Sequence, residues 1–116
     1  MIALGEFDGW SKKDVVDWIK NKMACQEIDR FEVLVADLTD ISNYEESVSF
    51  LLKEKSTGEL RELHDFHCSC GGFKWYEPER TSVEYLSDQT ERNHVIWGQT
   101  NVKKLIEKLK KEEDDG

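Results

Sequence analysis

The first clear pattern of hydrophobic and polar positions is a helical one, over residues 11–24. Val15, Trp18 and Ile19 follow the i, i+3, i+4 spacing that places side chains on one face of a helix. Ser11 stands four residues before Val15, at the start of the pattern, where a hydroxyl is a favourable N-cap. The pattern therefore predicts an amphipathic helix over 11–24.

Three segments in the middle of the chain predict antiparallel strands over 31–38, 47–55 and 59–67. The first is a short apolar run rich in β-branched residues. The other two alternate apolar and polar positions around Ser56-Thr57-Gly58, a three-residue connection that ends in glycine. This order predicts a β-hairpin with Gly58 in a left-handed conformation. The polar segment 40–46 is expected to be a loop.

Two helices are predicted after the strands. Residues 81–84 read TSVE, a capping-box sequence, so a short helix is expected from Thr81 to about Ser87. A longer helix is expected over 101–113 from a stripe of Val102, Leu105, Ile106 and Leu109.

The predicted fold is therefore α+β, with a three-stranded antiparallel sheet, an N-terminal helix, a short helix and a C-terminal helix. The length of 116 residues fits one domain. We expect that domain over 1–111, followed by a frayed acidic tail over 112–116.

Charge narrows the range of partners. The chain has 25 acidic and 16 basic side chains, for a formal net charge of −9. Such a field repels nucleic-acid phosphates and anionic lipids and favours a basic protein surface as partner, although plain solubility is the alternative explanation of the charge.

No apolar run approaches the ~20 residues of a membrane span, and residues 1–10 lack the basic start of a secretory signal. We expect a cytoplasmic protein, monomeric or weakly dimeric, without direct contact to nucleic acid or membrane.

Candidate metal chemistry is concentrated in residues 63–72, which read LHDFHCSCGG. Imidazole and thiolate are the ligands that tetrahedral zinc prefers, so a structural zinc ion is predicted here. A further ligand from the end of the first helix would tie that helix to the hairpin. The candidate ligands are His64, His67, Cys68 and Cys70, with Cys25 or His94 from outside the segment.

Two alternatives to zinc remain open. The C-x-C spacing is less typical of zinc sites than C-x(2–4)-C, and the first alternative is that the thiols are small buried hydrophobic groups. A reactive thiol is the other alternative. Three cysteines are too few for a usual disulfide framework. Because neither an orienting acid nor an oxyanion site accompanies the thiols in the sequence, no enzymatic activity is predicted.

Two acidic stretches are candidates for contact with a partner. Aromatic residues flanked by acids are typical of protein-binding loops, and the stretch after the glycine pair has this composition. More acids follow the first strand. The alternatives are that the aromatic residues belong to the core and that the acids form a solvated face. The candidate residues are Trp75, Tyr76, Glu77 and Glu79 in one stretch, and Asp40, Glu45 and Glu46 in the other.

The sequence over about 44–86 resembles a set of small phage and prophage proteins with an HCSC-x-G … W-x-P-E-x-T pattern. The resemblance rests on HCSC at residues 67–70, followed by Trp75, by EPE at residues 77–79 and by Thr81. Trp75 and the proline are one residue further apart than in that pattern. His67, Cys68 and Cys70 match the motif, whereas His64 and Cys25 do not belong to it.

The resemblance implies a phage origin. Small acidic phage proteins without a catalytic constellation often resemble inhibitors of host defence, among them anti-CRISPR proteins. The expected function is therefore a zinc-stabilised inhibitor that binds a type II CRISPR effector nuclease, whose DNA channel is basic, and blocks DNA binding. The alternatives are an immunity or regulatory protein that neutralises a basic toxin or host enzyme, and a plain metal-binding domain.

Overall fold

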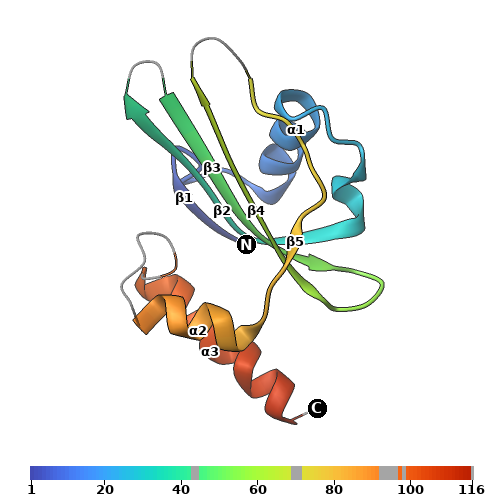
Figure 1. Ribbon diagram of the computed structural model, residues 1–116, viewed down its shortest axis with the longest axis vertical. Helices are drawn as coiled ribbons and strands as arrows, with labels where there is room; N and C mark the ends of the chain where they lie inside the picture. The colour runs from blue at the N-terminus through green and yellow to red at the C-terminus, as the bar shows by residue number, and fades with distance from the viewer. Residues whose placement is uncertain (43–44, 69–71, 92–96, 98, 116) are drawn as a thin grey trace. The chain divides into compact units, whose positions relative to one another are not determined.

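A computed structural model describes residues 1–42, 45–68, 72–91, 97 and 99–115 of the chain (Figure 1). The contacts divide the chain into two compact units, residues 1–80 and 81–116. The first unit contains a β-sheet with one α-helix and a short 3-10 helix, and the second contains helices α2 and α3. The predicted α+β class is confirmed.

The sheet of the first unit is mixed and, within the described residues, has five strands in the order β1-β2-β3-β4-β5. β1 pairs in parallel with β2, and the other neighbours pair antiparallel. The predicted three-stranded antiparallel sheet is therefore too small, because it lacks the two short edge strands. The bounds are Ile2–Gly5 for β1, Phe31–Ser42 for β2, Glu45–Glu54 for β3, Leu60–Cys68 for β4 and Glu79–Arg80 for β5.

The hairpin of β3 and β4 is confirmed. Gly58 has a φ of +77°, the left-handed conformation that its place at the end of the connection predicts. Its amide donates a hydrogen bond of 2.8 Å to the Glu54 carbonyl and closes the turn.

The expected loop over 40–46 is wrong for most of its length. Asp40 pairs with Glu46 and Ser42 with Glu45, so β2 and β3 continue into this segment as a hairpin. Residues 43 and 44 lie outside the described part of the chain. Backbone pairing with a neighbouring strand outweighs the low strand propensity of these polar residues.

Helix α1 (Lys12–Lys22) confirms the first predicted helix. The Ser11 hydroxyl accepts a hydrogen bond of 3.1 Å from the Asp14 amide and satisfies one N-terminal donor. Val15 and Ile19 are fully buried in a core cluster with one face of the sheet, and Figure 1 shows α1 alongside the strands. We call this the α1 face; its apolar residues are Phe31, Val33, Ala36, Leu38, Val48, Phe50, Leu52 and Leu63.

The 3-10 helix η1 (Glu27–Arg30) leads directly into β2. Its Ile28 is buried in the same core cluster, next in sequence to a charged residue on either side. A single buried position in four residues has no periodicity, and the sequence pattern therefore did not predict this element.

The end of β1 approaches the backbone of β2 closely. Gly5 has a φ of +62°, and a Cβ atom there would lie 2.2 Å from the Leu38 carbonyl oxygen. The amide of Glu6 donates a hydrogen bond of 2.7 Å to that same oxygen. Glycine at this position thus permits the contact that fixes β1 on the sheet.

We expect Gly5→Ala to lower the free energy of unfolding by more than about 2 kcal/mol, because left-handed strain alone costs about 1–2 kcal/mol and the Cβ would displace the Leu38 carbonyl. Gly9→Ala is the matched control, since Gly9 also has a positive φ, +87°, but nothing lies within 4 Å of its Cβ position. Chemical denaturation measures both variants. Equal losses would show that the close approach contributes nothing.

The second unit consists of α2 (Val83–Glu91) and α3 (Thr100–Asp115). The helix expected from Thr81 begins two residues later, because the Ser82 hydroxyl accepts a hydrogen bond of 3.1 Å from the Tyr85 amide and acts as the cap. Helix α3 begins one residue before the predicted range of 101–113 and ends two residues after it, at Asp115. None of the helices in the described part of the chain is long and apolar enough to cross a membrane.

Candidate functional site

The structure separates the two histidines of the predicted zinc site. His64 and His67 lie three residues apart on β4, so their side chains are on opposite faces of the sheet. His67 stands opposite Glu46 on the α1 face, whereas His64 stands opposite Ser49 on the other face. The two imidazoles therefore do not converge on one ion.

His64 instead belongs to a hydrogen-bonded row across β3 and β4. Its Nδ1 lies 2.8 Å from the Ser49 hydroxyl, and its Nε2 lies 3.0 Å from Oε1 of Glu62. Hydroxyl, imidazole and carboxylate stand in the order of a nucleophile, its base and an orienting acid. The β3 backbone around Ser49 is paired with strands on both sides, so it does not supply free amides for an oxyanion. We interpret the row as a structural cross-strand network.

The cysteines give the zinc prediction little structural support. Cys25 is buried in the core cluster of the α1 face, and burial raises the pKa of its thiol, which disfavours the thiolate that zinc binds. The side chain of Cys68 lies outside the described part of the chain, as do Cys70 and His94. Among the described residues, no group of three or more His, Cys, Asp and Glu is arranged to hold a metal ion. Zinc remains a prediction from the sequence.

The aromatic residues expected in a partner-binding loop make contacts inside the first unit. Trp75 is half-buried, with its ring centroid 6.2 Å from that of Phe31, and its amide donates a hydrogen bond of 3.3 Å to the Met23 carbonyl. The hydroxyl of Tyr76 accepts a hydrogen bond of 2.9 Å from the His64 amide and donates one to the His64 carbonyl. Tyr76 thus covers the outer edge of β4.

The two predicted acids of the same stretch, Glu77 and Glu79, also interact with residues of the first unit. Glu77 forms an ion pair of 3.4 Å with Arg30, which is 47 residues away in the sequence. Glu79 is exposed on β5 and pairs with Glu62 of β4. The stretch therefore connects η1, through the ion pair of Glu77, with β4, through the strand pairing of Glu79.

The hairpin brings two of the other predicted acids together. Asp40 and Glu46 are directly opposite each other on the α1 face, where β2 ends and β3 begins. Glu45 is next to Glu46 on the strand and therefore belongs to the other face. Glu6, which the sequence analysis missed, joins the pair. We call Glu6, Asp40 and Glu46 the acidic end.

The electrostatics of Glu6 show that these carboxylates act on one another. Although Glu6 is exposed, partial desolvation first, and then the negative charges of Glu46 and Asp40, raise the pKa of its carboxyl above the ordinary value of 4.5. In addition, His67 lies 3.6 Å from a Glu46 carboxylate oxygen. The acidic end is thus a local concentration of negative charge with one imidazole beside it.

The raised pKa predicts a pH-dependent gain for Glu6→Gln. The folded chain binds the Glu6 proton more tightly than the unfolded chain, so stability is lost as the pH rises from about 4.5 through the higher folded pKa. Removing the charge should therefore raise the free energy of unfolding at pH 7, by less than about 1 kcal/mol for an exposed group. Below about pH 4 the gain should disappear, because the carboxyl is protonated in both states. Urea unfolding at both pH values measures this, and a gain that is equal at both would contradict it.

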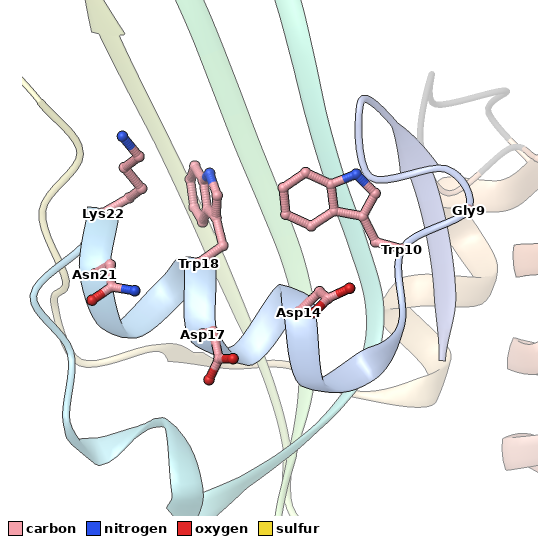
Figure 2. Close-up of a pocket in the computed structure, with 7 residues that line it drawn as sticks. All are labelled: Gly9, Trp10, Asp14, Asp17, Trp18, Asn21 and Lys22. Carbon is pink, nitrogen blue, oxygen red and sulfur yellow. The ribbon is translucent and has the colours of Figure 1, made fainter.

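Trp10, Trp18 and Lys22 line two hollows, and the larger of the two adjoins the acidic end. Figure 2 shows these three side chains on the same side of α1, in a row with Trp18 between Trp10 and Lys22. The smaller hollow, about 410 Å³, also has Asp14 and Asp17 of α1 in its lining (Figure 2). The larger hollow, about 650 Å³, is completed by Glu6, Leu38, Glu46, His67, Gly72 and Phe73.

A buried aromatic residue supports the walls of these hollows. Phe7 is fully buried, and its ring centroid lies 5.1 Å from that of Trp10 and 5.2 Å from that of Trp18, both in edge-to-face geometry. Phe73 also supports this wall: its ring centroid lies 5.5 Å from that of Trp18 and 4.3 Å from that of His67. The tryptophans are therefore held in place by rings rather than free on the surface.

The comparisons with known proteins provide no independent guide to this site, because no family model, curated protein or solved structure matches the chain. The resemblance to phage proteins accordingly stays an expectation, and the function is argued from the residues of the acidic end and the hollows.

Proposed function

We propose that the protein is an inhibitor that binds the basic surface of a nucleic-acid-handling protein and keeps nucleic acid away from it. The observation that carries this proposal is the acidic end, where Glu6, Asp40 and Glu46 gather on one face beside a hollow of about 650 Å³. Carboxylates spaced along a surface take the place of phosphates on a basic partner.

The electrostatics favour a cationic partner. Desolvation and, after it, the negative charges of Glu46 and Asp40 raise the pKa of Glu6, so these carboxylates exert a mutual repulsion in the free protein. Lysine and arginine side chains of a partner would relieve it, and complementary charge also speeds association. The net charge of −9 adds a long-range attraction to the same cationic partner.

The target that we propose is a type II CRISPR effector nuclease, because its DNA channel is lined with positive charge. A basic toxin is a target of the same electrostatic kind, and it differs from the nuclease in identity rather than in the physics of binding. The acidic end serves either one by the same contacts.

Competition against DNA tests the proposal. The purified protein is titrated into an effector–guide complex with labelled target DNA, and DNA binding is followed at 50 and 500 mM salt. We expect displacement at low salt that weakens steeply at high salt, since exposed charges are screened within about 8–10 Å at physiological ionic strength. Binding to the effector that is insensitive to salt, or that leaves DNA binding intact, would contradict the proposal.

We also propose that zinc stabilises the protein through His67, Cys68 and Cys70, the residues that match the HCSC motif. Protein purified without added metal should carry about one zinc per chain, and Cys70→Ser should lower both the zinc content and the melting temperature, the latter by several degrees. Cys25→Ala is the control: it also removes a thiol, but from the apolar core, and should leave the zinc content unchanged. A metal-free protein, with Cys70→Ser melting like wild type, would refute a zinc site.

A further inference from the structure

We propose that the larger hollow is a binding site for an arginine side chain of the partner, with the guanidinium lying on Trp10 and paired with the carboxylates of Glu6 and Glu46. This inference rests on the proposed function and specifies its chemistry. The site would convert a general attraction between charged surfaces into recognition of one side chain.

Two tryptophans form an aromatic wall of the larger hollow. Trp10 is 37% exposed although its ring packs edge-to-face on the buried Phe7. An indole fixed in this way keeps a face available at little cost in conformational entropy. Tryptophan is the aromatic side chain that binds cations best through its π-system. Trp18, the second wall, is fixed by Phe7 and Phe73 in the same manner.

The charge around the hollow favours a cationic ligand. Glu6 and Glu46 line it directly, and Asp40 lies opposite Glu46 on the adjacent strand. The positive groups in the lining are Lys22 and, when protonated, His67. Lys22 lies at the other end of the row from Trp10 (Figure 2), and His67 lies 3.6 Å from Glu46. The two carboxylates of Glu6 and Glu46 thus outnumber the one lysine ammonium in the lining.

The size of the hollow suits a single side chain of a partner. A hollow of about 650 Å³ lies within the range of small-ligand sites, about 300–1,000 Å³. A side chain with a planar head fills such a space better than a flat protein surface would. Arginine fits both walls, because guanidinium stacks on aromatic rings and binds carboxylates in a bidentate manner, whereas the lysine ammonium is a strongly hydrated point charge.

The probe is a short arginine peptide titrated into the full-length protein and followed by the indole N–H resonances of the four tryptophans. Trp10 and Trp18 should shift and saturate, while Trp75 and Trp97, which do not line the hollow, should stay unchanged. The same peptide with citrulline in place of arginine keeps the shape and loses the charge, and it should give no saturable shift. Equal shifts with the citrulline peptide, or shifts confined to Trp75 and Trp97, would overturn the inference.

Two variants of Trp10 separate the π-face from simple packing. Trp10→Leu keeps an apolar side chain but removes the π-face, and it should weaken binding of the arginine peptide about three- to tenfold, whereas Trp10→Phe should retain most of that binding. Thermal melting of both variants checks that the fold is intact. Unchanged binding by Trp10→Leu would overturn the site.

The effector titration distinguishes this inference from the proposed function. If the protein displaces DNA in a salt-dependent manner but Trp10→Leu does so as well as wild type, the proposed function stands and the arginine site is wrong. If the arginine peptide binds as expected but no effector is inhibited, the site stands and the proposed target is wrong.

Discussion

Reversal of two charges at the acidic end, Asp40→Lys with Glu46→Lys, is expected to weaken binding to the basic partner about 100-fold at low salt. The two carboxylates are opposite each other on one face, so both would approach the same basic surface, and like charges placed across an interface cost several kcal/mol. The loss should lie mainly in the association rate and should shrink as salt is added. Surface plasmon resonance at two salt concentrations measures both quantities.

The matched control is Glu112→Lys with Glu113→Lys on α3. Both residues are exposed, and this variant changes the net charge of the chain by the same four units. If long-range attraction to the whole molecule explains binding, the two variants should be equally weak. A much larger loss from the acidic-end variant would instead locate the contact on the α1 face.

Folding needs a separate check in this variant, because His67 loses the carboxylate 3.6 Å away. Exposed ion pairs contribute about 0–1 kcal/mol, so we expect little change in melting temperature. A variant that melts like wild type but still binds with full affinity would show that Asp40 and Glu46 do not contact the partner.

The elements that the sequence predicted are those with strong local patterns. The segments of α1 and of the β3–β4 hairpin each carry both a periodicity and a boundary signal, Ser11 in one case and Gly58 in the other. The residues that stabilise each of these elements lie close to one another in the sequence. Local propensity and tertiary structure therefore agree in these elements.

The elements that the sequence analysis missed depend on partners that are distant in the chain. β1 is only four residues, IALG, and becomes a strand because it pairs in parallel with residues 35–38 of β2. The acids at 40–46 were expected in a loop for the same reason, since only the opposing strand gives them an extended conformation. Non-local pairing of this kind leaves almost no periodic signal in a short segment.

The candidate site was predicted in part. Asp40 and Glu46 were proposed as partner-binding residues and lie together, but Trp75, Tyr76 and Glu77 make contacts within the fold. Composition alone cannot distinguish an exposed aromatic residue from one that covers a sheet edge. Glu6 and Trp10 were missed because they follow β1, and their place beside the acids depends on that strand.

Phe7→Ala is expected to cause the largest loss of stability among single changes near the site, about 3–5 kcal/mol. Phe7 is fully buried and touches Trp10, Trp18 and Phe50 with its ring, so truncation leaves a cavity where the β1 turn, α1 and the sheet meet. Such a loss is a large fraction of the 5–15 kcal/mol that holds a typical domain folded. Chemical denaturation followed by circular dichroism measures it.

Phe66→Ala is the matched control, because it removes the same ring from an exposed position. Phe66 is 52% exposed and belongs to the other face of β4, so Phe66→Ala should cost less than about 1 kcal/mol. Phe7→Leu, which keeps apolar volume but removes the ring edges, should be intermediate in stability, and it should loosen Trp10 and Trp18. If the aromatic walls determine binding, Phe7→Leu will bind the arginine peptide more weakly than wild type while still folded. Similar losses for Phe7→Ala and Phe66→Ala would show that Phe7 does not support the core, and the two tryptophans would then need another anchor.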